Sequence, residues 1–237
     1  MRIDKLLSNA LGIGRKEIRQ SVKKGLVRCN GNVIKDPSVH VDENNDEIVF
    51  CGEAVKYREF VYLMLNKPEG YISATYDKKY PVVTDLVPAE YAHFEVFPVG
   101  RLDIDTHGLL LLTNDGDLAH RLLSPKSHVP KTYFVESAKP VKEEDIKIFE
   151  NGIELEADFT TLPAKLEIAS DDKTESLVTI YEGKFHQVKR MFEAIDNEVV
   201  YLKRISMGGL KLDQALAEGQ CRELTAEELD ALCAKNN

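Results

Sequence analysis

Electrical charge is distributed very unevenly along this chain of 237 residues. Residues 1–35 hold nine Lys or Arg against two acidic residues, a local charge of +7, whereas residues 59–237 hold 20 basic and 32 acidic residues, a local charge of −12. The whole chain carries −9, which excludes a basic coat spread over the entire protein. Such asymmetry favours a small basic module joined to a larger acidic body, although charge alone also allows a merely solvated basic helix face.

The basic N-terminal region has the pattern of two short helices followed by a hairpin. Ile3, Leu6 and Leu7 recur at helical spacing, and a second helix is expected over residues 15–24, with Gly25 as its left-handed stop. Strands are expected at residues 26–29, 32–34 and 47–50, with an Asn-Gly turn between the first two. Residues 51–59 are polar and predict a linker, so we place the domains at residues 1–58 and 59–237.

The acidic body shows strand and helix patterns without regular alternation. Helices are expected over residues 117–123, with Asp117 as the cap, and over residues 185–195, where apolar residues recur at helical spacing. The expected strands are residues 60–65, 109–113, 131–137, 165–169, 177–181 and 199–205. Because βαβ alternation is missing, we expect an α+β protein whose mixed, mainly antiparallel sheet is flanked by helices.

Composition excludes several other classes of protein. No run approaches the ~18 uncharged apolar residues of a membrane-spanning helix, and the N-terminal residues lack the apolar core of a signal peptide. The four cysteines form no CxxC pair, and no His or Asp cluster has metal-ligand spacing, so no metal is expected. These features predict a cytoplasmic protein without a membrane partner.

One segment carries the remaining chemical signal. Residues 100–109 contain the run Gly-Arg-Leu-Asp, followed by a second aspartate, a histidine and the start of an apolar strand. On pattern alone, Asp103 is a turn residue that precedes a strand. Its interpretation therefore depends on what surrounds it in the sequence.

The N-terminal region resembles an S4 RNA-binding domain. The resemblance rests on residues 2–7, 14–18, 24–27 and 30–31. In that family two helices and a hairpin present a basic surface to folded RNA, where Lys and Arg neutralise phosphates and release counterions. The resemblance implies that the following residues bind RNA: Arg2, Lys5, Arg15, Lys16, Arg19, Lys23, Lys24 and Arg28.

The body resembles pseudouridine synthases, and most closely the RsuA family of ribosomal small-subunit pseudouridine synthases. Four segments match in the proper order, namely residues 64–70, 100–112, 131–133 and 182–191. The resemblance implies isomerisation of one uridine in 16S ribosomal RNA, with Asp103 as catalytic nucleophile or base. Substrate and product are isomers, so no cofactor is expected.

The resemblance also implies roles for three further residues. Tyr133 would stack on the uracil, which has to leave its RNA stack to be reached. Lys189 would pair with Asp103 and favour its ionised form, while Arg101 would contact phosphate or hold the flipped nucleotide. The expected partner is 16S rRNA or a small-subunit assembly particle, bound by a monomer. A synthase acting on 23S rRNA or tRNA, and a non-catalytic RNA-binding factor, remain the alternatives.

Overall fold

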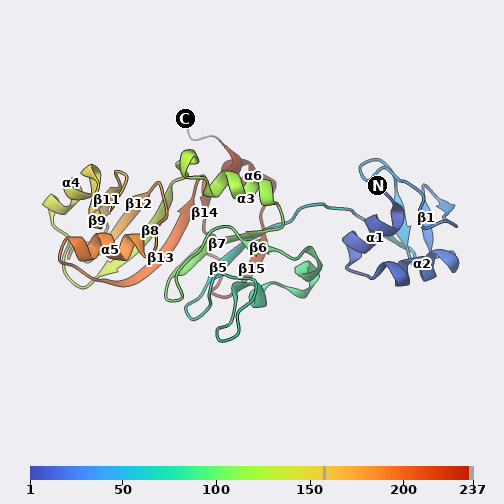
Figure 1. The fold of residues 1–237 in the computed structure, drawn as a ribbon, viewed down its shortest axis with the longest axis horizontal. Coiled ribbons are helices and arrows are strands. Elements are labelled where there is room, and N and C mark those ends of the chain that lie inside the picture. Colours follow the sequence, from blue (N-terminus) through green and yellow to red (C-terminus); the bar gives the residue numbers. More distant parts are fainter. Residues whose placement is uncertain (157–158, 235–237) are drawn as a thin grey trace. The chain divides into compact units, whose positions relative to one another are not determined.

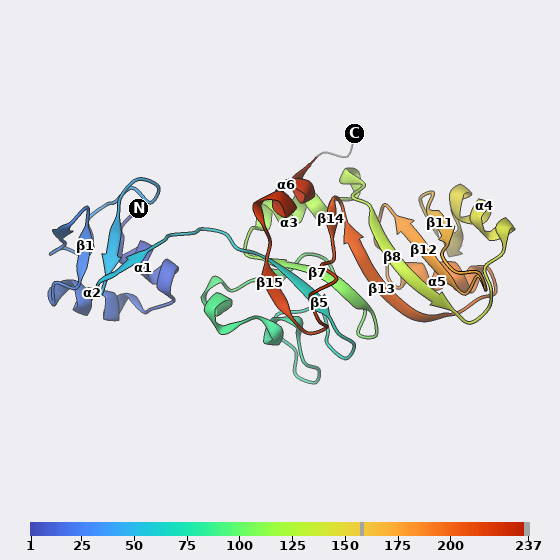
Figure 2. The same ribbon diagram turned by 180° about the vertical axis from the view of Figure 1, so that it is seen from behind.

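The computed structural model describes residues 1–156 and 159–234, which form two compact units (Figures 1 and 2). The first unit comprises Met1–Val61 and Pro88–Val96. The second comprises Tyr62–Val87 and the chain from Phe97 onward. Residues 88–96, which contain the 3-10 helix η2 (Ala89–Phe94), thus join the first unit from the middle of the chain.

The first unit is built from two helices and a small antiparallel sheet. Helix α1 (Ile3–Leu11) and helix α2 (Arg15–Lys23) pack their apolar residues on one core, and α2 is followed by Gly25 at φ +73°, the predicted left-handed stop. The sheet has the order β2-β1-β3-β4. Its strands are β1 (Val27–Cys29), β2 (Asn32–Val33), β3 (Ile48–Phe50) and β4 (Glu53–Val55).

Strand β4 corrects the prediction of a polar linker over residues 51–59. Ile48 pairs with Val55 and Phe50 with Glu53, so the segment doubles back on β3 and extends the sheet. Cys51 and Gly52 take positive φ values and make the tight turn. The backbone hydrogen bonds of a hairpin outweigh the polar side chains, which remain largely exposed.

A mixed sheet forms the body of the second unit. Counted over the described residues it has nine strands, seven of them in the order β11-β12-β8-β13-β7-β5-β15, while β14 pairs with β13 and β6 with β7. Strands β13 and β7 run parallel, and the other neighbouring pairs between described strands run antiparallel. The strands are β5 (Tyr62–Lys67), β6 (Phe97–Pro98), β7 (His107–Thr113), β8 (Lys131–Ser137), β11 (Lys165–Ile168), β12 (Glu175–Ile180), β13 (Val199–Met207), β14 (Leu210–Lys211) and β15 (Cys221–Glu223). The predicted α+β class is confirmed.

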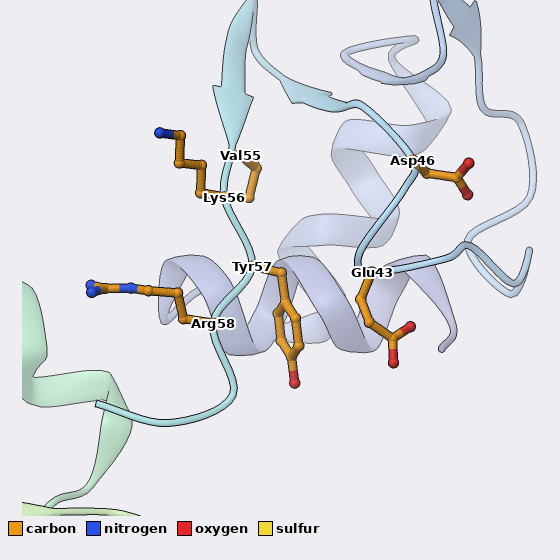
Figure 3. A pocket seen from close by; sticks show the side chains of 6 residues that line it. All are labelled: Glu43, Asp46, Val55, Lys56, Tyr57 and Arg58. Atoms are coloured by element: carbon orange, nitrogen blue, oxygen red, sulfur yellow. The ribbon is translucent and has the colours of Figure 1, made fainter. Parts of the chain in front are cut away.

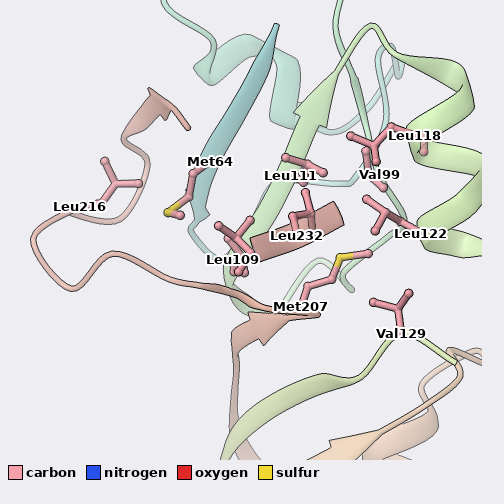
Figure 4. Packing of buried hydrophobic residues seen from close by; sticks show 12 residues of the cluster. Met64, Val99, Leu109, Leu111, Leu118, Leu122, Val129, Met207, Leu216 and Leu232 are labelled. Atoms are coloured by element: carbon pink, nitrogen blue, oxygen red, sulfur yellow. The ribbon is translucent and has the colours of Figure 1, made fainter. Parts of the chain in front are cut away.

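Helices flank this sheet at two places (Figures 1 and 2). Helix α3 (Gly116–Leu123) and helix α6 (Ala226–Cys233) pack with β7 and β13 in one apolar cluster, in which Leu111, Leu122 and Met207 are almost completely buried (Figure 4). Helix α4 (Glu143–Asn151) and helix α5 (Gln187–Ala194) contact each other through an edge-on pair of phenylalanine rings. The remaining short elements are η1 (Val83–Leu86), η3 (Pro125–Ser127), β9 (Glu154–Glu156) and β10 (Phe159–Thr160).

Two expected boundaries in the body are wrong. Helix α3 is capped by Asp115, whose carboxylate accepts the Leu118 N–H at 2.9 Å, and not by Asp117. Strand β5 continues through Asn66 and Lys67, beyond its expected end at residue 65, because both residues pair with β7. Pairing with a neighbouring strand thus overrides the local turn signal of Asn-Lys-Pro.

No helix within residues 1–156 and 159–234 is both long enough and apolar enough to cross a lipid bilayer.

Candidate active site

The Gly-Arg-Leu-Asp segment lies in a loop between β6 and β7, wound around a buried ammonium group. Lys67, at the end of β5, is 0% exposed. Its Nζ donates to the carbonyl oxygens of Asp103 and Thr106 at 3.0 and 2.8 Å, and also reaches those of Pro68 and Ile104. Burial lowers the pKa of Lys67 to about 8, although the negative charges of the nearby carboxylates act to raise it. The ammonium therefore fixes the backbone that carries Asp103.

Glycine at position 108 allows this loop to enter the sheet. Gly108 has φ +99°, and a Cβ there would lie 2.3 Å from the backbone oxygen of Arg204. The two residues are partners in the parallel β7–β13 pair. Any side chain at position 108 would push the two strands apart at the end of the Asp103 loop.

The side chain of Asp103 lies beside two basic groups supplied by the start of α5. Lys189 Nζ is 3.4 Å from Asp103 Oδ2, and His186 Nε2 is 3.7 Å from Asp103 Oδ1. Lys189 lies closer still to Asp105, whose Oδ1 accepts its hydrogen bond at 2.5 Å. The predicted partner of Asp103 is therefore shared between two carboxylates.

This sharing is visible in the electrostatics of Asp105. Burial acts to raise the pKa of Asp105, but the hydrogen bond and the charge of Lys189 outweigh burial and lower it below its ordinary value. Asp105 thus remains ionised at neutral pH and holds Lys189 in place. Asp103 keeps oxygen atoms that can reach a substrate, with 28% of its side chain exposed.

Asp103 lines a cleft of about 850 Å³ within the second unit. Its lining includes Arg101 and Asp103 from the loop before β7, and residues 180–188 from the end of β12 to the start of α5. Strand β8 contributes Tyr133, which is 7% exposed and pairs in register with Arg204 on β13. Arg101, Asp103 and Tyr133 therefore meet in one cleft, and Lys189 joins them through its contact with Asp103.

Two buried cations on this sheet face were missed by the sequence interpretation. Lys131 and Arg204 both line the cleft, and each donates to a backbone carbonyl, of Val129 at 2.9 Å and of Leu109 at 2.8 Å. Burial, followed by the charge of Arg204, lowers the pKa of Lys131 to about 8. Within the described residues neither forms a salt bridge with a carboxylate, although the charge of Glu182, which also lines the cleft, acts to raise the Lys131 pKa. A lysine alternating with Tyr133 on β8 was the available signal.

The cationic residues predicted to bind RNA are all exposed on the first unit. Helix α2 presents Arg15, Arg19 and Lys23 at intervals of four residues, on one helix face. Arg2 and Arg19 both reach the buried carboxylate of Asp4, at 2.8 and 3.5 Å, which brings the start of α1 to this face. The hairpin carries Arg28, which donates to the Gly31 carbonyl.

A second hollow lies in the first unit (Figure 3). Its lining consists of Glu43, Asp46, Val55, Lys56, Tyr57 and Arg58, and so includes two acidic and two basic side chains. Two carboxylates in its wall make it unsuitable for phosphate groups. Across the described parts of the chain, no three His, Cys, Asp or Glu side chains cluster as metal ligands would.

Comparison with known proteins decides the family. Residues 61–194 match the family model described as RNA pseudouridylate synthase, and residues 1–48 match that of the S4 domain. The chain belongs to the RNA pseudouridylate synthase family. The resemblance inferred from the sequence is thereby confirmed for both regions.

Full-length relatives agree with this assignment. An RNA pseudouridine synthase of Bacillus subtilis, YtzG, is 54% identical over 98% of both chains. Ribosomal small subunit pseudouridine synthase A of Haemophilus influenzae is 41% identical over 98% of this chain and 99% of its own. A crystal structure of a pseudouridylate synthase, 39% identical, superposes with a TM-score of 0.68 and covers 98% of this chain and 99% of that one. This pseudouridine synthase thus matches these relatives over 98% of its length.

Proposed function

We propose that this synthase isomerises one uridine of 16S rRNA, with Asp103 as the nucleophile or base. One observation carries the proposal: Asp103 stands on a loop held by the buried Lys67 ammonium, at a cleft that also contains Tyr133. The choice of small-subunit RNA is supported by the relative from Haemophilus influenzae, which is named for that subunit.

The isomerisation requires three steps in the cleft. The C1′–N1 bond must break, the uracil must turn, and C5 must bond to C1′ before its proton is lost. An ionised Asp103 would either attack C1′ or remove the 2′ proton to give a glycal. Tyr133 would stack on the uracil after the nucleotide has flipped out of its RNA stack, and a cleft of about 850 Å³ offers the room.

The basic groups around Asp103 have a consistent place in this scheme. Lys189 would keep positive charge at the carboxylate, while Asp105 positions the Lys189 side chain from the other side. Arg101, exposed at the cleft wall, would bind a phosphate of the flipped nucleotide.

The first unit would supply the long-range attraction to the RNA. Its exposed Lys and Arg side chains suit the phosphates of folded rRNA, free or within a small-subunit assembly particle. We place this reaction in the cytoplasm and assign it to a monomer, because one chain contains both the cleft and the basic surface.

Mapping the modified uridine tests the proposed substrate. Pseudouridines in 16S and 23S rRNA are compared between cells with and without the protein, and one 16S site is expected to disappear. A site lost from 23S rRNA or tRNA instead would contradict the small-subunit assignment. Loss of no site would favour a non-catalytic RNA-binding factor.

Asp103→Asn tests the proposed catalytic residue. The change is nearly isosteric, so the variant should fold and bind RNA as wild type does, but it should fail to restore the missing pseudouridine. Asp105→Asn is the matched control, since it removes a neighbouring carboxylate of the same loop and should retain measurable turnover. Multiple turnover by purified Asp103→Asn protein would contradict the assignment of Asp103 as the catalytic residue.

A further inference from the structure

An apolar ring at the cleft is exposed to solvent, and it has no role in the reaction described above. Phe185 lies in the loop between β12 and α5, lines the cleft, and is 72% exposed. Burying a phenylalanine side chain stabilises a fold by about 1.5–3 kcal/mol, so folding itself gives no reason to leave this ring outside.

The loop that carries Phe185 is firmly held. The side chain of Gln187, 4% exposed, accepts the Lys184 N–H at 2.9 Å and donates to Glu182 at 3.1 Å. Glu182 in turn accepts the Leu162 N–H at 2.8 Å. The ring of Phe185 is therefore presented by an ordered turn whose hydrogen bonds are made by its neighbours and not by the ring.

One face of the ring is already stacked. The rings of Phe185 and His186 lie with centroids 3.8 Å apart and planes 18° from parallel. His186 Nε2 is 3.7 Å from Asp103 Oδ1, so the inner ring of this pair lies beside the proposed catalytic carboxylate. The high exposure of Phe185 leaves the outer side of this two-ring stack open to a further planar group.

We propose that the outer face of Phe185 is a stacking site for the base of a nucleotide that flanks the target uridine. The inference rests on the proposed function, since it takes the target uridine to lie against Asp103 and Tyr133. The ring of His186 lies between Phe185 and Asp103 in this chain of contacts, so we assign the base stacked on the outer face to a neighbouring nucleotide rather than to the reacting one. Every base has a π face, and the site therefore accepts any base.

The surroundings of Phe185 suit RNA. Lys184 precedes it in the chain, is exposed, and also lines the cleft. Its ammonium group can neutralise a phosphate beside a stacked nucleotide. Anchoring the flanking base while the uridine turns out into the cleft stabilises the opened RNA strand that the reaction needs.

Binding of the full-length protein to a 16S rRNA transcript that spans the mapped uridine tests the site. Phe185→Ala should weaken affinity roughly 5- to 100-fold, as expected when one aromatic–base stack is removed, while Phe185→Trp should bind at least as well as wild type. Val200→Ala is the control, because Val200 is a similarly exposed apolar residue, 68% exposed, outside the cleft.

Abasic nucleotides locate the stacking position. Transcripts that lack the base at one position on either side of the uridine are bound by wild type and by Phe185→Ala. For one abasic position, the affinity of wild type should fall to that of Phe185→Ala. Phe185→Ala should bind this abasic RNA no more weakly than it binds intact RNA. Equal affinities of wild type and Phe185→Ala on intact RNA, or an undiminished difference on every abasic RNA, would overturn the proposal. Turnover of the intact transcript is measured separately: its absence in wild type contradicts the proposed function, whereas normal turnover with equal affinities contradicts only the stacking site.

Discussion

At the scale of single residues, Lys67 shows how the fold builds a loop around one charge. Its ammonium is completely buried and, among the described residues, faces backbone carbonyls rather than a carboxylate within salt-bridge distance. Carbonyl oxygens that would otherwise repel one another can then converge in the Asp103 loop. Lys67 is a positioning residue, since it acts on the substrate only through the backbone of this loop.

Replacement of Lys67 by methionine should leave an apolar side chain of similar length and an unsupported loop. We expect kcat to fall by about 100-fold, because small misplacements of a catalytic group have effects of that size, with little change in RNA affinity. Hydrogen exchange in residues 100–106 should accelerate in the same variant, a change that loss of charge alone would not produce. Lys211→Met, an exposed lysine on β14, is the control. Unchanged exchange and unchanged kcat in Lys67→Met would refute this role.

At the scale of elements, helices α1 and α2 are joined by an ion pair network as well as by their apolar core. Asp4 of α1 is completely buried and accepts hydrogen bonds from Arg2 at 2.8 and 3.0 Å, while Arg19 of α2 lies 3.5 Å away. Burial opposes ionisation of Asp4, but both arginines together lower its pKa below the ordinary 3.8. The same carboxylate therefore stabilises the helix pair and holds two arginines on the basic surface.

Asp4→Asn should destabilise the first unit in a pH-dependent way. A carboxyl whose pKa is lowered by folding stabilises the native state above its unfolded pKa, and this stabilisation disappears as the pH falls through the folded pKa. The variant should therefore have a lower Tm than wild type at pH 5–7. Its free energy of unfolding should be smaller by about 1–3 kcal/mol. The difference should shrink below pH 3.8, the ordinary pKa of Asp4. A difference in Tm that is constant from pH 7 to pH 3 would contradict this account.

Three basic side chains of α2 should determine part of the salt dependence of RNA binding. Arg15, Lys16 and Lys23 are exposed, and within the described chain no carboxylate lies within salt-bridge distance of them. Changing all three to alanine should reduce the slope of log affinity against log salt by about 0.7–0.9 for each phosphate that the protein no longer neutralises. The charge-matched control changes Lys142, Lys147 and Lys165 of the body. Equal slopes for both triple variants would show that these three side chains of α2 are only solvated surface.

At the scale of the whole molecule, the two units have separate apolar cores. The core of the first unit draws on residues 3–48, and the cluster of Figure 4 draws on residues from Met64 onward. The proposed catalytic residues belong wholly to the second unit. The proposed division between RNA binding and chemistry therefore follows the boundary between two units with separate cores.

Deletion of residues 1–58 should leave a folded second unit. Residues 88–96 would be left without their packing partner, since they belong to the first unit, but none of them is part of the apolar cluster of Figure 4. The truncated protein should bind its RNA more weakly and with a shallower salt slope, and the rate of conversion of already bound RNA should change little. Parallel salt dependences with equal affinity for intact and truncated protein would contradict the division of labour.

The amino-acid sequence by itself determined the division into a basic and an acidic part and most helices and strands. These features depend on local composition and periodicity, which are properties of neighbouring residues. The segment around Asp103 was identified by its resemblance to pseudouridine synthases and not by its local pattern. Even the wrong cap at Asp117 lay within two residues of the observed one, because the aspartates of that turn are chemically alike.

Only the tertiary structure decided what surrounds Asp103. Lys67 reaches Thr106, Lys189 is shared between Asp103 and Asp105, and each contact joins residues far apart in the chain. The strand pairing that buries Lys67 also extended β5 beyond its predicted end. Such contacts are set by which strands become neighbours and by what charge can be satisfied between them, and no local pattern contains that information.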